Sequence, residues 1–298
     1  MLRILCSLIT FVLSTQMAVA IDHKPPNVHQ TLTLNHDGRA RSYHLHLPAN
    51  TADAIPLIVV LHGLGGHADK LRYGLGLNSR ADEHGYAMVY PQGLESQWGP
   101  HWNAGFPFTD VDDVGFLTKL ARDLQESYNI DPARTYVLGI SVGGFMAYHL
   151  ACTAPDVFTA EAIVLGSMSG QDWRSCGSQK PSQDDPVSIL HIHGTDDPLI
   201  PYDGSEHWAS GWGGADAIPQ VVERWAKRQS AKPIPPTFDL PGAKTTSYRN
   251  ANDGTEVTLI SLQGYGHDWP HQENSTISAA DVVFDFFNRV QRAPGPVN

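Results

Sequence analysis

Apolar runs rich in β-branched residues alternate along this chain with stretches of helical periodicity, and this alternation restricts the fold more than any other feature. The run Ile55–Leu61 is almost entirely apolar, as expected for a strand that is covered on both faces. The candidate strands are Tyr43–Leu47, Ile55–Leu61, Ala87–Tyr90, Thr135–Gly139, Ala162–Leu165, Val187–His193 and Val257–Leu262. The candidate helices are Lys70–His84, Val111–Tyr128, Gly143–Cys152, Ile218–Gln229 and Ser278–Arg289. This order predicts an α/β fold whose central sheet is mostly parallel and carries helices on both faces.

The sequence is organised as one folding unit. It has 298 residues and shows no internal repeat or low-complexity tract. Its longest proline-rich stretch, Lys232–Pro236, is expected to be a loop and is too short for a linker between domains. We therefore expect a single domain over residues 21–298, without a separate lid domain.

The N-terminal residues have the composition of a secretory leader. Arg3 gives a positive start, Ile4–Leu13 form a short apolar core, and Ala18–Ala20 have the small residues of a cleavage site. The apolar run is too short, and too often interrupted by polar residues, to span the ~30 Å of membrane hydrocarbon. We expect residues 1–20 to be a signal peptide that is removed, so that the protein is secreted to the extracellular space or the periplasm.

Two cysteines, Cys152 and Cys176, remain after removal of the leader. An even number of cysteines in an oxidising compartment favours a disulfide bond. No residues around either cysteine suggest a reactive thiol. The sequence therefore predicts one disulfide between these two residues.

Acidic residues outnumber basic ones, with 31 Asp and Glu against 20 Lys and Arg and a formal charge of −11. Long-range repulsion between this charge and phosphate or anionic headgroups works against binding to nucleic acid or to a membrane surface. We expect neither partner.

The sequence GISVG, residues 139–143, matches the pattern G-x-S-x-G around Ser141. An apolar strand pattern leads into it and a helical pattern follows it. A turn between a strand and a helix forces its apex residue into a strained conformation, and flanking glycines relieve the crowding where no Cβ would fit. This context predicts that Ser141 is a nucleophile at the carboxyl edge of the sheet rather than part of an ordinary glycine-rich turn.

A serine hydroxyl is a weak nucleophile at neutral pH and needs an adjacent base. In a fold of this kind the expected order along the chain is Ser, then Asp or Glu, then His. The sequence GTDDP follows one apolar run and contains Asp196 and Asp197, and GYGHDWP follows the last run and contains His267 and Asp268. We predict that His267 is the base. Asp197 is the favoured acid because it opens the D-x-x-I-P turn, while Asp196 and Asp268 remain alternatives.

Two backbone N–H groups are candidates for stabilising an oxyanion. Val142 directly follows the serine at the start of a helix, where its N–H points toward the reacting atoms. The second candidate is the N–H of Leu64 in LHGLGG after an early strand, because Gly63 lets the main chain approach the site closely.

Two histidine pairs, His44 with His46 and His191 with His193, lie two residues apart in strand patterns and share a face. No further ligands at zinc spacing accompany them, and neither HExxH nor CxxC occurs. We expect no metal and no cofactor.

Several sequence blocks, taken together, are similar to one known family. They are LIVVLHGLGG, VYPQGL, WNAG, VDDVGFL, DPARTYVLGISVGGFMAYHLAC, ILHIHGTDDPLIPYDG and GYGHDWP. The series resembles the secreted poly(3-hydroxybutyrate) depolymerase-like esterases, a group of α/β-hydrolases that includes feruloyl esterases. The resemblance implies the α/β-hydrolase fold, nucleophile Ser141, acid Asp197, base His267 and oxyanion donors at Val142 and Leu64.

The same resemblance implies that Trp102 and Asn103 line the acyl-binding side of the cleft. Trp269, two residues after His267, is a further candidate for substrate contact, since exposed aromatic faces suit a phenolic acid, a sugar or a polymer surface. Where similar proteins often carry Asn-Gly-Cys, this chain has Gln229–Ala231, so one disulfide of the family is absent.

The implied activity is that of a serine carboxylic ester hydrolase. Its substrate would be a hydroxyalkanoate oligomer or polymer, or a phenolic-acid ester of a plant polysaccharide. Three alternatives remain open: a serine peptidase of the same fold, an acyltransferase, and a non-catalytic carbohydrate-binding protein.

Overall fold

A computed structural model describes residues 31–49, 54–106, 109–178, 186–204, 215–235 and 240–290. The predicted signal peptide, residues 1–20, lies outside the described residues. Within the described part of the chain, no helix is long and apolar enough to cross a membrane.

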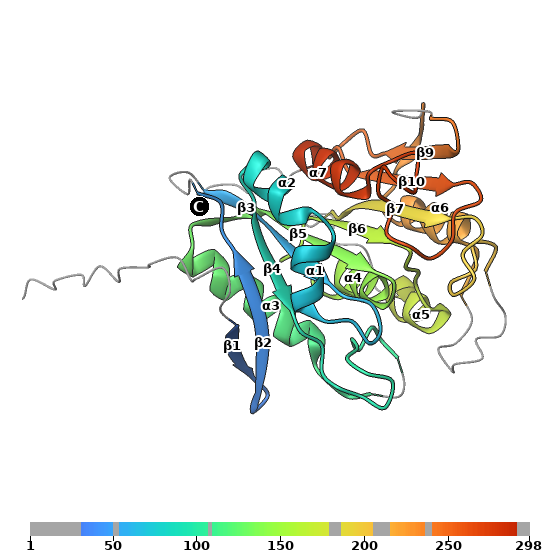
Figure 1. Ribbon diagram of the computed structural model, residues 1–298. Helices are drawn as coiled ribbons and strands as arrows, with labels where there is room; N and C mark the ends of the chain where they lie inside the picture. Colours follow the sequence, from blue (N-terminus) through green and yellow to red (C-terminus); the bar gives the residue numbers. More distant parts are fainter. Residues whose placement is uncertain are drawn as a thin grey trace, which may run out of the picture.

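The described chain is built around one ten-stranded sheet in the order β1-β2-β4-β3-β5-β6-β7-β10-β9-β8 (Figure 1). The strands are β1 (Leu32–His36), β2 (Arg39–His46), β3 (Ile55–Leu61), β4 (Ala87–Pro91), β5 (Ile130–Ile140), β6 (Ala160–Val164), β7 (Ser188–Gly194), β8 (Lys232–Ile234), β9 (Ala243–Arg249) and β10 (Glu256–Leu262). Strands β4, β3, β5, β6, β7 and β10 run parallel to their neighbours in this series. At the two edges, β2 with β1 and β9 with β8 pair antiparallel.

Helices cover both faces of this sheet (Figure 1). They are α1 (Ala68–Gly74), α2 (Leu77–His84), α3 (Asp113–Ser127), α4 (Val142–Thr153), α5 (Gly170–Ser178), α6 (Ile218–Arg228) and α7 (Ala279–Arg289). Buried side chains of α3, α4 and α6 pack in the core on one face, and those of α1, α2 and α7 pack in the core on the other. The predicted α/β fold, with a mostly parallel sheet between two helical layers, is confirmed.

The predicted elements differ from the structure at five places. The predicted helix Lys70–His84 is two helices, because Gly76 between α1 and α2 adopts the left-handed conformation with φ 68°. The stretch expected to be a loop at Lys232–Pro236 begins with the short strand β8, which pairs with β9. Strands β1 and β9 and helix α5 were not predicted.

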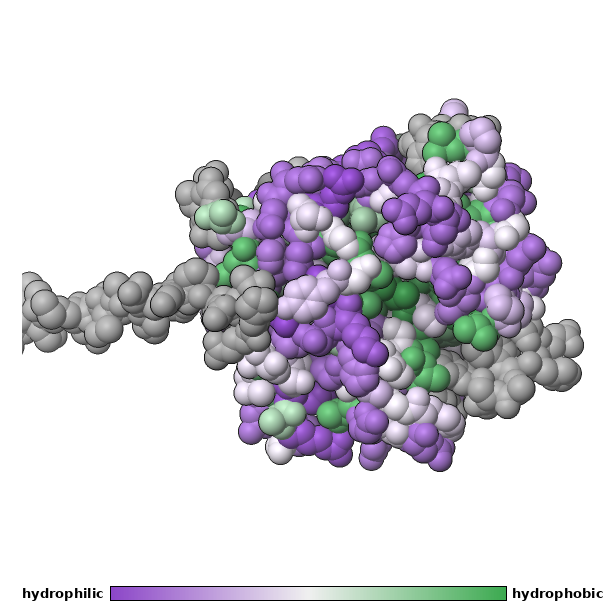
Figure 2. Space-filling model, viewed as in Figure 1, coloured by the Kyte–Doolittle hydropathy of each residue, from purple (hydrophilic) through white to green (hydrophobic). Residues whose placement is uncertain are grey.

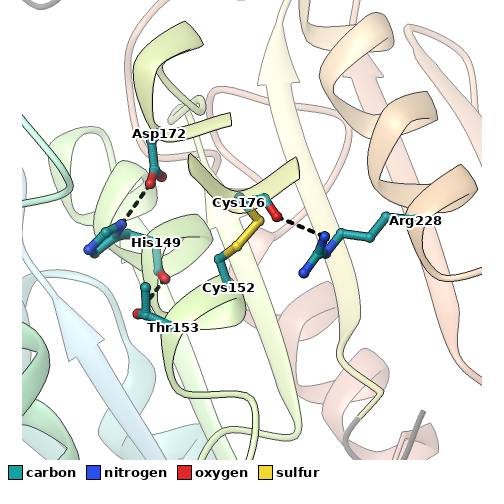
Figure 3. The surroundings of a disulfide bond; sticks show 6 residues. All are labelled: His149, Cys152, Thr153, Asp172, Cys176 and Arg228. Carbon is teal, nitrogen blue, oxygen red and sulfur yellow. Dashed lines mark hydrogen bonds and ion pairs between the residues drawn. A yellow bond between two sulfur atoms is a disulfide. The ribbon is translucent and has the colours of Figure 1, made fainter. Parts of the chain in front are cut away.

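The predicted disulfide is present and joins Cys152 of α4 to Cys176 of α5, with a Cα–Cα distance of 5.7 Å (Figure 3). Two further contacts hold α5 in place. His149 Nδ1 lies 2.7 Å from Asp172 Oδ1, and Arg228 donates a 3.0 Å hydrogen bond to the Cys176 carbonyl. Helix α5 is therefore fastened to both α4 and α6.

Candidate active site

Ser141 is the single residue between β5 and α4, at the carboxyl edge of the sheet. Its backbone has φ 54° and ψ −117°, a conformation that a residue with a side chain rarely adopts. A Cβ at Gly139 would lie 2.1 Å from the Gly143 carbonyl oxygen, and one at Gly143 would lie 2.2 Å from the Leu61 carbonyl oxygen. Both glycines of the pattern are therefore required by close backbone approach.

The structure brings Ser141, His267 and Asp197 together from three different loops. His267 Nε2 lies 3.0 Å from Ser141 Oγ, and His267 Nδ1 lies 2.6 Å from Asp197 Oδ2. Since a carboxylate can only accept, Nδ1 carries the proton and Nε2 is free to accept the serine proton. The His267 side chain is 14% exposed, whereas that of Asp197 is fully buried.

The Asp197 carboxylate is held by the loop that carries it. Its Oδ1 accepts hydrogen bonds from the backbone N–H groups of Leu199 at 2.8 Å and Ile200 at 2.9 Å. Burial alone would raise the pKa of Asp197, but the hydrogen bonds from His267, Ile200 and Leu199 outweigh burial and lower the pKa below its usual value. The carboxylate is thus ionised at neutral pH.

The two alternative acids do not contact the imidazole of His267. Asp196 is exposed and accepts a hydrogen bond from the Thr195 hydroxyl at 3.1 Å. Asp268 is exposed as well, although it is adjacent to His267 in sequence.

The loops after β7 and β10 are joined by several hydrogen bonds. The backbone N–H groups of Thr195 and Asp196 donate to the carbonyls of Leu262 and Tyr265, at 2.9 and 3.0 Å. The Gly264 N–H donates to Thr195 Oγ1 at 2.9 Å. The acid and the histidine are consequently carried by two loops that are bonded to each other.

The loop after β3 lies against Ser141. A Cβ added to Gly63 would be 3.1 Å from Ser141 Cβ and 3.6 Å from Ser141 Oγ. Leu64 follows directly, and within the described part of the chain its N–H donates no hydrogen bond. Val142 is the first residue of α4, where a backbone N–H has no partner inside the helix. Both predicted oxyanion donors therefore lie on segments next to the serine.

Trp102 does not line a cleft, contrary to the prediction. Its side chain is fully buried, its indole N–H donates to the His62 carbonyl at 2.9 Å, and its ring packs against the His62 ring with centroids 4.9 Å apart. Burial lowers the pKa of His62 to about 4, so this ring is neutral. Trp102 supports the loop after β3 through its contacts with His62, and it has no exposed surface for a ligand.

Asn103 and Trp269 are partly buried. The Asn103 side-chain amide donates to the Val111 carbonyl at 2.9 Å, and its backbone N–H donates to Asp113 Oδ2 at 2.8 Å. Trp269 packs against the core that includes α7, and its backbone carbonyl accepts a hydrogen bond from the Tyr265 hydroxyl at 3.2 Å. Their contact with a substrate stays a prediction.

Large hydrophobic side chains remain exposed on three loops at the carboxyl edge of the sheet. They are Leu64 after β3, Trp98 after β4 and Leu199 after β7, which are 40%, 47% and 66% exposed. The carboxyl ends of parallel strands meet at one edge, so the loops that carry these side chains lie at the same edge of the sheet as Ser141. In Figure 2, hydrophobic residues gather at a hollow near the middle of the face, within a hydrophilic surround.

The residues that the structure describes contain no group of three or more His, Cys, Asp or Glu side chains arranged to hold a metal ion. His44 and His46 lie near Asp69 and Asp82, at 3.7 and 2.8 Å. The other pair, on β7, is buried behind Asp197, a relationship that was not predicted.

Comparison with known proteins gives a consistent result. Residues 41–193 match the family described as esterase PHB depolymerase. Feruloyl esterase C of Emericella nidulans is 32% identical, over 83% of this chain and 83% of its own. The bifunctional acetylxylan esterase/xylanase XynS20E of Neocallimastix patriciarum is 25% identical over 88% of this chain. The matched region covers 35% of the length of that protein. An acetyl xylan esterase from Aspergillus awamori has a similar solved structure, with a TM-score of 0.65 at 16% identity, covering 88% of this chain and 99% of its own.

Proposed function

This chain belongs to the esterase PHB depolymerase family, and from this premise we propose that it is a serine carboxylic ester hydrolase that works through an acyl-serine intermediate. The family expected from the sequence blocks is confirmed. The observation that carries the proposal is the series of contacts from Ser141 Oγ to His267 at 3.0 Å and from His267 to Asp197 at 2.6 Å.

In the first half of the reaction, Ser141 Oγ forms a bond to the ester carbonyl carbon while its proton moves to His267 Nε2. Asp197 stabilises the imidazolium that results and keeps the ring in the orientation that accepts the proton. The tetrahedral intermediate then collapses, the bond from carbon to the alcohol oxygen breaks, and His267 donates its proton to the leaving alcohol. Water repeats these steps on the acyl-serine and releases the acid.

The negative oxygen of the tetrahedral intermediate needs hydrogen-bond donors that are already in position. We assign this role to the backbone N–H groups of Leu64 and Val142. Both lie beside the serine, one after Gly63 and one at the start of α4. The helix dipole favours negative charge at that end of α4.

For the substrate we favour an ester with an aromatic acyl group. The exposed side chains of Leu64, Trp98 and Leu199 offer apolar surface on loops at the same edge of the sheet as the serine, which suits a ring better than a charged acyl group. A feruloyl esterase is also among the relatives that match this chain over most of its length. Hydroxybutyrate oligomers are the alternative within the same family.

We further propose that the protein is secreted after removal of residues 1–20 and that residues 21–298 form one domain. The positive start, short apolar core and small residues of the leader support this proposal.

The activity is tested with methyl ferulate, p-nitrophenyl butyrate and a film of amorphous polyhydroxybutyrate. We expect turnover of the first two, no effect of a chelator, and at least a thousandfold lower kcat for Ser141→Ala, about the loss found when a catalytic serine is removed. A matched control is Ser167→Ala, since Ser167 is fully buried and its hydroxyl has no partner among the described residues.

The nucleophile is tested separately with an organophosphate, which should label Ser141 and nothing else in the wild-type protein. Labelling of a different residue, or equal activity of wild type and Ser141→Ala, contradicts the proposal.

A further inference from the structure

Two histidines of β7 lie behind the acid of the site and take no part in the steps above. His191 and His193 are two residues apart on a strand, so their side chains point to the same face of the sheet. Both side chains are fully buried, and they point into the core shared with α4. Buried polar rings need hydrogen-bond partners, and each of these rings has one on either side.

An unbroken series of contacts leads from α4 to the acid. Tyr148 Oη of α4 lies 2.8 Å from His191 Nδ1, and His191 Nε2 lies 3.2 Å from His193 Nδ1. His193 Nε2 lies 2.9 Å from the carbonyl oxygen of Ile200 and 3.4 Å from Asp197 Oδ2. We call Tyr148, His191 and His193 the buried chain.

The direction of every hydrogen bond in the buried chain follows from its last acceptor. The Ile200 carbonyl can only accept, so His193 carries its proton on Nε2. A neutral His193 then accepts at Nδ1, and the donor to it is His191 Nε2–H. His191 in turn accepts at Nδ1, and the donor to it is the Tyr148 hydroxyl.

The groups of the buried chain are uncharged. Burial lowers the pKa of His191 well below its usual value and also lowers the pKa of His193. Glu161 of β6 is the carboxyl that acts on Tyr148, and burial raises its pKa well above the usual range. The carboxylate that faces His193 is that of Asp197, at 3.4 Å.

All the donors of the buried chain point toward the acid. Hydrogen bonds aligned in one direction polarise one another, and here the last N–H faces a carboxylate. The same N–H binds Ile200, whose own backbone N–H binds Asp197 Oδ1 at 2.9 Å. His193 thus fixes both the carboxylate and the loop on which it sits.

We propose that Tyr148, His191 and His193 are positioning residues that hold Asp197 in the orientation needed by His267. This assignment rests on the proposed ester hydrolysis. It predicts that a single hydroxyl on α4, separated from the serine by four intervening side chains, contributes to kcat.

The test is Tyr148→Phe, which removes that hydroxyl and keeps the ring. The matched control is Tyr136→Phe, because Tyr136 is equally buried and its hydroxyl donates a 2.8 Å hydrogen bond to the Val290 carbonyl in the core on the other face. For Tyr148→Phe we expect kcat for p-nitrophenyl butyrate to fall about tenfold, the effect of one lost buried hydrogen bond, with KM unchanged. For Tyr136→Phe both constants should stay within about twofold of wild type.

A second pair of variants tests His193 itself. In His193→Gln the side-chain amide keeps an N–H for the Ile200 carbonyl, whereas His193→Leu keeps only apolar volume. We expect His193→Gln to retain most of kcat and His193→Leu to lose it. In the double variant with His193→Leu, the additional effect of Tyr148→Phe should disappear, since the two act through one series of bonds.

A spectroscopic measurement does not depend on turnover. The proton between His267 and Asp197 should give a low-field NMR resonance that moves in Tyr148→Phe and not in Tyr136→Phe. An unmoved resonance with unchanged kcat, or equal losses in both tyrosine variants, overturns the assignment. Failure of the proposed function looks different, since wild type and Ser141→Ala would then hydrolyse the esters equally poorly.

Discussion

Asp196 and Asp197 are adjacent in sequence, yet only the carboxylate of Asp197 contacts the imidazole of His267. The difference comes from the turn after β7. Asp197 Oδ1 accepts the N–H groups two and three residues ahead, and this local bonding aims Oδ2 at the histidine. The D-x-x-I-P pattern favoured Asp197 for the same reason, although the sequence alone left Asp196 open.

Replacement of each aspartate by asparagine separates their roles. Asp197→Asn should lower kcat by about 10⁴, because an amide can donate to the histidine and stabilise the wrong tautomer. Asp196→Asn should change kcat less than about twofold, since among the described residues its exposed side chain is hydrogen-bonded to Thr195 and not to His267. Initial rates on p-nitrophenyl butyrate at neutral pH are sufficient. Equal effects of the two substitutions would argue against Asp197 as the acid.

Other residues could not be assigned in advance because burial decides their role. Trp102 was expected in the cleft on the strength of its sequence block, but full burial makes it a support for His62. The buried chain behind Asp197 was visible only as an HIH sequence on a strand. Its connection to Tyr148 depends on how α4 packs on the neighbouring strands β5 and β6, which no local pattern states.

Among the elements, the central parallel strands were the most predictable, since each is an apolar run buried on both faces. Edge strand β1 and strand β9, which lies next to the other edge, are half-polar and alternate between more and less exposed positions, which hid them. The Asp37-Gly38 dipeptide between β1 and β2, both residues with positive φ, is a hairpin signal that would have located the first of them.

Helix α5 is the element that depends most on covalent support. Its sequence, GQDWRSCGS, holds two glycines and an aspartate, and its propensity for helix is low. The disulfide, together with the contact between His149 and Asp172, holds it against α4 (Figure 3).

Replacement of both cysteines by alanine should lower the free energy of unfolding by about 3 kcal/mol, the value expected for closing a loop of this length. The bridge spans a sequence separation of 24 residues and its sulfur atoms do not touch the site, so kcat at room temperature should stay near the wild-type value. Urea unfolding measures the first quantity. Wild type in a strong reductant should unfold like the variant, and a variant as stable as the oxidised protein would contradict the role given to the bridge.

The whole molecule keeps several histidines neutral inside its two cores. His62, His191 and His193 are fully buried, and burial lowers the pKa of each, to about 4 for His62. In the unfolded chain these rings take up a proton near the ordinary value of 6.5. Between the two values only the unfolded state binds the proton, so acid favours unfolding.

The free energy of unfolding should therefore be constant above pH ~6.5 and fall as the pH decreases toward ~4, with His62 alone accounting for about 3 kcal/mol. Asp197 acts in a lower window, because its lowered pKa adds stability that is lost only below the ordinary pKa of a carboxyl group. Urea unfolding at about pH 7 and at about pH 4.5, above and below the ordinary pKa of a histidine, measures the effect.

The variant His62→Gln is the comparison for this measurement. A glutamine cannot titrate. The free energy of unfolding of the variant should therefore fall less between the two pH values than that of wild type, whatever the variant's stability at neutral pH. Parallel curves for the two proteins would show that His62 does not contribute.

The bonded loops after β7 and β10 have a mechanical consequence. Thr195 and Asp196 are hydrogen-bonded to Leu262 and Tyr265, so we expect the acid and the histidine to move together. Ser141 stands at the end of β5, outside these two loops, and its hydroxyl lies 3.0 Å from His267 Nε2. On heating, we therefore expect the contact between the Ser141 hydroxyl and the His267 ring to lengthen before the contact between His267 and Asp197 does. A cross-link between those two loops should therefore add little to the heat resistance of the site. A cross-link between the serine turn and the histidine loop is the change expected to preserve catalysis at high temperature.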